Sequence, residues 1–398
     1  MRNKLSVAAF AMAVLMTACN SSENTTSTTR IELPGTVDTE AFAANVESIS
    51  VMNLQMCDDW AFVNYPWMAF GDNYVYLLEG VQSRLSCFDR QTGEKLAART
   101  IKGNGPGEFM YINAMFCNGD TLCVTDEKGN ILQYDQKITF LGKLYELGEE
   151  LSHYKVMPFG RKNYALVTRD GGSDQPVLVT DRQFNIVSRH FPVQETQRTL
   201  SSGVAESIYS KGDTVRGFLG NDNRIFTLYG ETEGYIELVV PNPLPMEVMQ
   251  QVISHAVDFK TVYEYDGLFG NLVESGRFIS FVYNFDGKRH TSLLDKHTKN
   301  VVSIPADGGN SDNTAGVFAD FFNKTTIFMT DGEFIYAKAP NARIAELIEG
   351  HDDALDERLK KTQASYREFL KRNAEYIKGL EPEERDAANV ILKIKLKN

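Results

Sequence analysis

The sequence has little histidine and cysteine, and it lacks the short motifs that mark several enzyme classes. Its 398 residues include six His and five Cys. The His residues show no pair at the i, i+4 spacing of H-E-x-x-H, and no C-x-x-C pair exists, which argues against a zinc ribbon or a redox centre. Neither G-x-S-x-G nor an EF-hand loop is present. We therefore expect no metal and no cofactor, and we assign no catalytic residue.

The sequence also lacks an apolar run long enough to span a bilayer, which needs about 20 residues. Its apolar run, Leu5–Met16, follows Arg2 and Lys4 and is interrupted by Ser6, which is the pattern of a secretory signal peptide. The end of this run, residues 15–19, resembles a bacterial lipobox, with Met16 where Leu is usual. The resemblance implies cleavage after residue 18 and acylation of Cys19. Asn20 stands where Asp would signal inner-membrane retention, which implies the outer membrane.

A polar stretch follows Cys19. Residues 21–29 are Ser, Thr and Asn with a single Glu, so we expect residues 19–44 to form a lipidated flexible tether. Without residues 1–18, which hold Arg2 and Lys4 and no acid, the net charge changes from −12 to −14. Such a surface repels phosphate backbones and argues against nucleic acid and anionic lipids as partners.

Four cysteines remain after Cys19. Cys117 and Cys123 flank a turn sequence, residues 118–120, and could form a disulfide across a hairpin in an oxidising compartment. The alternative is that all four are buried, reduced thiols packed as small apolar groups. We favour the reduced thiols, because strand alternation alone does not establish disulfide geometry.

One pattern repeats six times after residue 45, at intervals of about 45 to 60 residues, as in propeller blades. A strand rich in β-branched and aromatic residues ends near an Asp, turns, and leads into a second such strand. The strand pairs are Tyr74–Leu78 with Arg84–Asp89, Thr121–Asp126 with Ile131–Asp135, Tyr164–Thr168 with Val177–Asp181, Arg224–Tyr229 with Tyr235–Val240, Phe278–Tyr283 with Thr291–Asp295, and Thr326–Thr330 with Phe334–Lys338. This predicts an all-β, six-bladed β-propeller over residues 45–398, because a closed ring covers the strand edges.

Two stretches interrupt the strands with helical spacing. Residues 246–257 predict a short helix between blades. Residues 352–378 predict a longer helix, capped by Asp352 or Asp353 and packed on the flank of the propeller. The final strand, 389–396, is expected to complete a blade with an N-terminal strand around Ile49–Leu54.

The most distinctive internal segment is Gly103–Asn104–Gly105–Pro106–Gly107–Glu108–Phe109. It lacks the Lys and Ser/Thr of a phosphate loop and has no strand–turn–helix context. We interpret it as a structural turn between blades, in which glycines take positive φ and Pro106 stiffens the bend.

At this point the chain resembles the six-bladed propeller lipoproteins of Gram-negative bacteria, which are related to NHL and TolB-like propellers. The resemblance rests on the turn Gly103–Phe109, on Thr121–Asp126 and on Tyr134–Asp135 with Phe140–Leu141. The family's closing strand has its counterpart in Asn389–Leu392 and Leu396–Lys397, without the usual Pro. The resemblance covers about residue 45 to the end and implies an envelope-exposed binding or scaffolding module.

Several polar residues are weaker candidates for a site. Asp126 and Asp331 end strands and either line the central channel or accept hydrogen bonds from turn N–H groups, which is the commoner role. Residues 307–313 have oxygen ligands at alternate positions but lack two features of a calcium loop. His290 and His297 flank a predicted strand and are expected at the surface.

Two functions remain open. The first, which we favour, is a binding or scaffolding module anchored in the envelope through Cys19, with a protein or glycan as partner. The second is a propeller hydrolase or lyase acting on a carbohydrate or lactone. The enzyme would need carboxylates or His converging at one mouth of the channel with perturbed pKa values.

Overall fold

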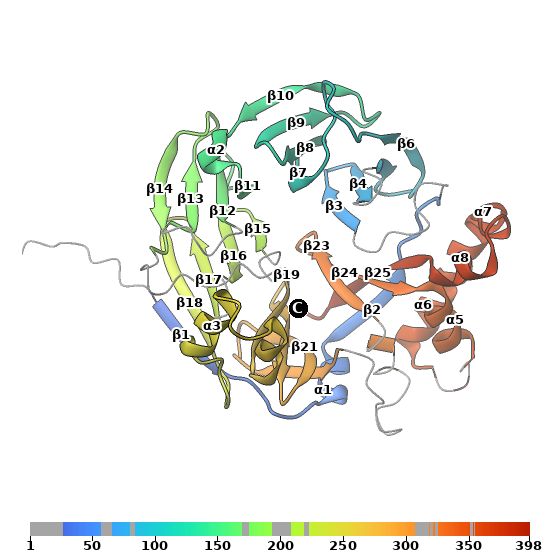
Figure 1. Ribbon diagram of the computed structural model, residues 1–398. Coiled ribbons are helices and arrows are strands. Elements are labelled where there is room, and N and C mark those ends of the chain that lie inside the picture. The colour runs from blue at the N-terminus through green and yellow to red at the C-terminus, as the bar shows by residue number, and fades with distance from the viewer. Residues whose placement is uncertain are drawn as a thin grey trace, which may run out of the picture.

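Six β-sheets form a ring in the computed structural model (Figure 1). The structure describes residues 27–56, 66–79, 84–168, 175–192, 208–218, 223–306, 318, 321–322, 325–350, 353 and 355–398. The six strand pairs expected from the repeats all form adjacent antiparallel strands, so the predicted six-bladed β-propeller is confirmed.

In the first five blades the strands follow one another in chain order from the centre of the ring outwards (Figure 1). The first blade contains β3 Pro66–Phe70, β4 Tyr74–Glu79, β5 Arg84–Asp89 and β6 Lys95–Thr100; the second β7 Ile112–Asn118, β8 Thr121–Asp126, β9 Asn130–Tyr134 and β10 Phe140–Glu146; the third β11 Tyr154–Phe159, β12 Asn163–Thr168, β13 Val177–Thr180 and β14 Ile186–His190. The fourth contains β15 Ile208–Lys211, β16 Thr214–Phe218, β17 Arg224–Tyr229 and β18 Thr232–Val239; the fifth β19 Gly267–Ser275, β20 Phe278–Phe285, β21 Lys288–Asp295 and β22 Val301–Pro305.

The sixth blade joins the two ends of the chain. Its strands are β23 Thr326–Thr330, β24 Phe334–Pro340, β25 Asn389–Leu396 and, outermost, β2 Val46–Val51. Strand β2 pairs antiparallel with β25, placing Ile49 opposite Ile394 and Val51 opposite Leu392. The predicted closure of a blade by both ends of the chain is confirmed.

The core lies between neighbouring blades. One apolar cluster joins the first and second blades and includes Tyr76, Leu85, Leu122 and Tyr134, all of them at most 1 % exposed. Comparable clusters lie between the later blades. Each buried Leu or Phe contributes roughly 1.5 to 3 kcal/mol, so the packing of blade against blade supplies most of the stability of the ring.

The segment before the ring is partly structured, which corrects the expectation of a flexible tether over residues 19–44. Strand β1, Ser27–Glu32, pairs parallel with β18 as a fifth strand on the outer edge of the fourth blade. Helix α1, Thr39–Ala44, is capped by Asp38 and buries Phe42, and it contacts β22 of the fifth blade. Residues 1–26, which include the predicted signal peptide and Cys19, lie outside the described residues.

Helices lie in three of the connections between strands, and the third of these connections holds one short helix. Between the fourth and fifth blades lie α3, Met246–Ile253, and the 3₁₀ helix η2, Phe259–Glu264, so the expected helix of 246–257 is present but shorter. Between β24 and β25 lie α5 Asn341–Glu349, α6 Glu357–Arg372, α7 Ala374–Lys378 and α8 Pro382–Ala387; the short α2, Gly148–Leu151, precedes the third blade. None of the helices in the described ranges is long and apolar enough to cross a membrane.

The long predicted helix of 352–378 has a different start. Asp356, and not Asp352 or Asp353, caps α6, because its carboxylate accepts hydrogen bonds from two N–H groups of the first turn. The apolar stripe packs against β2 as expected, with Leu359, Tyr366 and Phe369 at most 2 % exposed. The expectation that this helix covers the flank of the propeller is confirmed.

Candidate functional site

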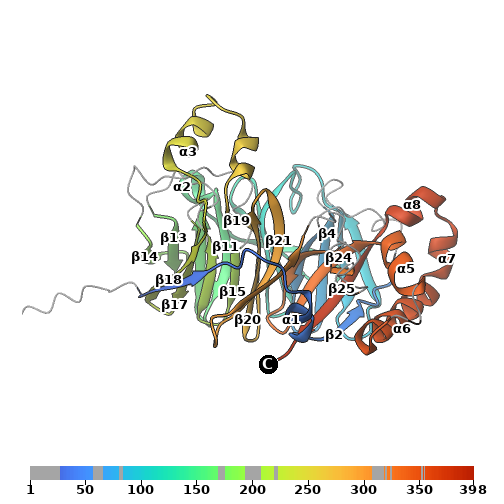
Figure 2. The same cartoon turned by 90° about the horizontal axis from the view of Figure 1, so that it is seen from below.

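One side of the ring carries the turn between the first and second strand of every blade, and we call it the turn face. These turns are linked from blade to blade by hydrogen bonds. The Gly160 N–H donates to Gly212 O across 2.6 Å, and the Gly276 N–H donates to Gly332 O across 3.3 Å. The opposite face carries α3, as the side view shows (Figure 2). The Asp331 network and the charges of the pocket described below lie on the turn face.

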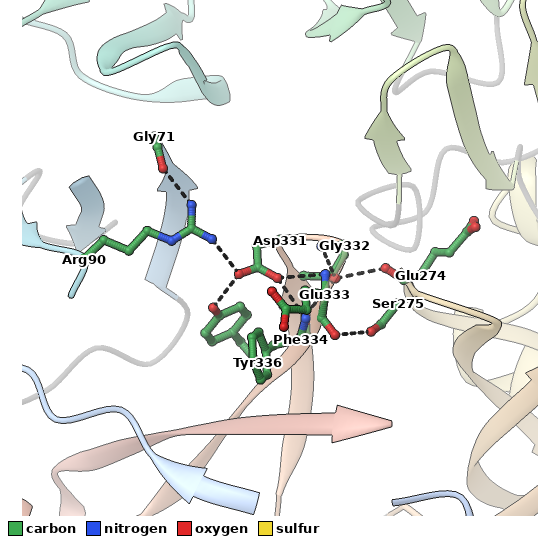
Figure 3. A network of polar contacts seen from close by, with 10 residues as sticks. Gly71, Arg90, Glu274, Ser275, Asp331, Gly332, Glu333, Phe334 and Tyr336 are labelled. Atoms are coloured by element: carbon green, nitrogen blue, oxygen red, sulfur yellow. Dashed lines mark hydrogen bonds and ion pairs between the residues drawn. The ribbon is translucent and has the colours of Figure 1, made fainter. Parts of the chain in front are cut away.

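Asp331 lies at the centre of a polar network that joins the sixth blade to the first (Figure 3). Its carboxylate is 3 % exposed and accepts from the Arg90 guanidinium at 2.9 Å and from the Tyr336 hydroxyl at 2.8 Å. It also accepts from the N–H groups of Glu333 and Phe334 at 3.0 and 2.8 Å. Arg90 in turn donates to Gly71 O at 2.7 Å. These four hydrogen bonds link the Asp331 carboxylate to other groups of the same chain.

The same network extends to the fifth blade (Figure 3). The Thr330 hydroxyl contacts Glu274 O at 2.9 Å, and the Ser275 hydroxyl donates to Glu333 O at 2.6 Å. The Glu274 carboxylate forms ion pairs with Arg216 and Lys296. Four consecutive blades, from the fourth through the sixth to the first, are thus tied together on the turn face, which supports a structural role for these charges.

Asp126 has the turn-capping role and does not extend the network. Its Oδ1 accepts from the N–H groups of Lys128 and Asn130 at 2.9 and 2.7 Å. Of the two interpretations open for Asp126 and Asp331, the acceptance of turn N–H groups is therefore confirmed for both.

The glycine-rich segment forms the connection between the first and second blades, as expected for a structural turn. The Glu108 carboxylate folds back and accepts from the Gly105 N–H at 2.9 Å, while Phe109 is 2 % exposed in the core. Gly107 alone of the three glycines takes a positive φ, +74°. At Gly103 and Gly105 a Cβ would lie 2.1 and 2.9 Å from Glu108 Oε2, so a larger residue there would require the Glu108 carboxylate to move from its hydrogen bond with the Gly105 N–H.

Cys117 and Cys123 are free thiols. Cys117 pairs with Leu122 and Cys123 with Phe116, so the two sulfurs point to opposite faces of the sheet and no disulfide joins them. Burial raises the pKa of Cys87 and Cys123 to about 12, as expected for inert, buried thiols. Cys57 lies outside the described residues, as does the loop 307–313 that resembles a calcium site.

A pocket of about 410 Å³ opens on the turn face between the third and fourth blades. Phe159 and Val179 form its buried wall, and the turn of residues 160–162 forms one side. The turns holding Asp213 and Glu231 form the other side. The volume lies within the range of small-ligand pockets, roughly 300 to 1,000 Å³.

The pocket combines charges of both signs that have no partner among the described residues. Arg161 and Lys162 supply two cations, and Asp213 and Glu231 supply two carboxylates. Within the described ranges, none of these four side chains makes an ion pair or hydrogen bond with the protein. The pocket can therefore offer cation and anion contacts to one small zwitterionic group.

Sequence reasoning missed these four residues. They come from three turns between residues 160 and 231, and none belongs to a motif. One sequence signal could have located the turn that holds Arg161 and Lys162. A Phe–Gly pair stands at the end of the first strand in two blades, Phe70–Gly71 and Phe159–Gly160, and marks equivalent turns.

Clustered carboxylates or histidines are the groups that an enzyme or a metal site would need. Within the residues that the structure describes, no group of three or more His, Cys, Asp or Glu side chains could hold a metal ion. The hydrogen bond from Arg277 holds the pKa of Asp295 far below its ordinary value, which keeps this carboxylate charged. His290 lies within β21 and is 6 % exposed, so its expected place at the surface was wrong, whereas His297 is exposed.

The chain is similar to known proteins in structure and in sequence. Among solved structures, the chain is similar to "a Putative exported protein" from Bacteroides fragilis, with a TM-score of 0.65 and 17 % identity over 94 % of this chain and 100 % of that one. It is also similar to a member of the DUF4221 family from Bacteroides vulgatus, with a TM-score of 0.48 and 10 % identity over 89 % of this chain and 99 % of that one. No curated protein matches.

A family model described as "6-bladed beta-propeller" (DUF5128) matches residues 20–337. This range includes the glycine-rich turn and all strands of the first five blades. The chain belongs to this 6-bladed beta-propeller family.

Proposed function

We propose that this protein is an exported lipoprotein, anchored in the outer membrane through acylated Cys19, that acts as a binding or scaffolding module for a protein or glycan of the envelope. The signal-like run Leu5–Met16 and the lipobox-like end at Cys19 support export and anchoring. Two or more acyl chains give stable membrane attachment. The NHL and TolB-like resemblance of the turn and strand motifs is part of this proposal.

The observation that carries the proposal is the position of strand β1, the first described element. Strand β1 lies on the outer edge of the fourth blade, while β2 and β25 close the ring independently of it. An anchor attached before β1 therefore leaves the rim of the ring and does not need to pass through its centre. The pocket between the third and fourth blades gives the module one place to hold a small polar group.

The test is to replace the anchoring thiol. We expect Cys19→Ala to release the protein from membranes into the soluble extracytoplasmic fraction, because the acyl chains have lost their attachment point. Its unfolding midpoint should match that of the parent, since the ring closes without Cys19. Ser21→Ala, two residues away, is the matched control and should stay with the membrane. A Cys19→Ala protein that still sedimented with membranes would contradict the proposal.

A further inference from the structure

The direction of β1 fixes the side of the ring from which the tether leaves. Strand β1 runs parallel to β18, and Ser27 pairs with Gly234, close to the turn of residues 230–231 on the turn face. Cys19 precedes Ser27 by eight positions in the sequence. A chain spans at most about 3.6 Å per residue, so the acylated end lies within roughly 30 Å of the turn-face rim.

Exposed apolar side chains concentrate on the same rim. Leu96, Leu141 and Val187 are each the second residue of the outermost strand in the first, second and third blades, and are 42, 56 and 59 % exposed. Ile186 is 39 % exposed beside Val187, and Tyr229 is 64 % exposed at the turn-face end of β17. We call these five residues the apolar rim.

Single exposed apolar residues are common on protein surfaces and need no explanation. A group of them on one rim of the ring does. Nine large apolar side chains of the described chain are exposed, and five of them form the apolar rim on four consecutive blades. Exposed apolar side chains that gather on one face of a protein mark a contact with a partner or a membrane more often than side chains scattered singly. Aromatic residues such as Tyr229 are favoured at the level of lipid headgroups, where one end is apolar and the other is hydrated.

The pocket supplies the polar part of the same surface. It lies between the third and fourth blades, and Val187 is one of its lining residues. Its unpaired charges, Arg161 and Lys162 against Asp213 and Glu231, sum to zero. A headgroup with one phosphate and one amine matches this pattern, whereas the net charge of −12 for the whole chain opposes an anionic lipid surface.

We infer that the apolar rim and this pocket form a membrane-contact surface that rests on zwitterionic phospholipid headgroups. Arg161 and Lys162 face the phosphate, and Asp213 and Glu231 face the amine. This inference rests on the proposed anchoring through Cys19, which brings the rim to the bilayer. The opposite face, which carries α3, is then presented away from the membrane (Figure 2).

Lipid-dependent quenching tests the orientation. The full lipidated protein is placed in phosphatidylethanolamine–phosphatidylcholine vesicles containing headgroup spin-labelled lipid, with a fluorophore on Val187→Cys, Leu141→Cys or Tyr111→Cys. Tyr111 is the matched control, because it is 71 % exposed and precedes β7 on the opposite face. We expect several-fold stronger quenching at positions 187 and 141 than at 111, after subtracting the signal of the parent's own cysteines. Equal quenching, or stronger quenching at 111, would overturn the inference.

A second comparison tests the headgroup. Arg161→Gln with Lys162→Gln should reduce quenching at position 187 several-fold, whereas Lys137→Gln, an exposed cation on another turn of the turn face, should not. Replacing the zwitterionic lipids with phosphatidylglycerol should weaken quenching; an increase would show an anionic-lipid site instead. The two proposals fail differently: protein that does not stay with vesicles refutes the anchor, while vesicle-bound protein with the reversed quenching pattern refutes only the contact surface.

Discussion

The contact between the first and second blades and the contact between the third and fourth blades share the same backbone design but use an aspartate differently. In both, a Phe–Gly pair ends the innermost strand, and the turn of the next blade brings an Asp against the Gly. Asp120 accepts from the N–H and the side-chain amide of Asn73, each at 2.7 Å. The Asp213 carboxylate accepts from no described residue, and Lys162 occupies the position of Asn73.

This difference distinguishes a charge that is hydrogen-bonded within the protein, which we call structural, from a charge without such a partner, which we call available. The carboxylate of Asp120, like that of Asp331 between the sixth and first blades, is satisfied by neighbouring protein groups and stabilises the ring. The carboxylate of Asp213 remains open to a ligand, and the pocket lies beside it. The contact between the third and fourth blades thus carries the candidate site because, among the described residues, Asp213 makes no counterpart of the two hydrogen bonds between Asp120 and Asn73.

The largest expected effect comes from Asp331→Ala. The substitution leaves the Arg90 guanidinium, the Tyr336 hydroxyl and two turn N–H groups without their acceptor. Removing one partner of a buried pair costs about 3 to 5 kcal/mol, and partial exposure of Arg90 favours the lower end. Urea unfolding of the purified protein measures the loss. A loss below about 1 kcal/mol would show that this contact resembles that of Asp213.

Gly160→Ala should have an intermediate effect. Gly160 has φ +61°, and a Cβ there would lie 2.5 Å from Asp213 Oδ1. The left-handed backbone alone costs roughly 1 to 2 kcal/mol for alanine. Adding Asp213→Ala should recover part of the loss by removing the close contact, but not the part due to φ. No recovery in the double variant would indicate that Asp213 moves aside freely.

The smallest effect distinguishes the two aspartates directly. Asp120→Ala should lower the free energy of unfolding by about 1 kcal/mol, because it removes two charge-assisted hydrogen bonds at a partly exposed site. Asp213→Ala should change it by less than about 0.5 kcal/mol, as expected for an unpaired surface charge. Equal losses for the two variants would remove the distinction between structural and available charge.

The sequence predicts the ring well because its signals are local. The six strand pairs, the closing strand 389–396 and the helical stripe of Leu359, Tyr366 and Phe369 follow from side-chain periodicity within short windows. The start of α6 was misplaced because several Asp residues precede it, and the tertiary packing of the helix selects Asp356 as its cap.

Elements that depend on distant partners were not predictable in this way. Strand β1 reads as a polar linker because Ser27, Thr28 and Thr29 bury little apolar surface; backbone pairing with β18, some 200 residues away, orders it. The pocket charges meet only after two blades pack together. Their lack of hydrogen-bond partners among the described residues results from that packing and cannot be predicted from the neighbouring residues in the sequence.

We propose that the mature chain begins at an acylated Cys19, which holds the protein at a membrane. Intact-mass measurement of the membrane-extracted protein tests this most directly, supported by the mass of its N-terminal peptide. We expect loss of residues 1–18 and added mass equal to a diacylglyceryl group, with or without a further acyl chain, on Cys19. A mature protein that begins elsewhere, or that keeps Cys19 as an unmodified thiol, would contradict it.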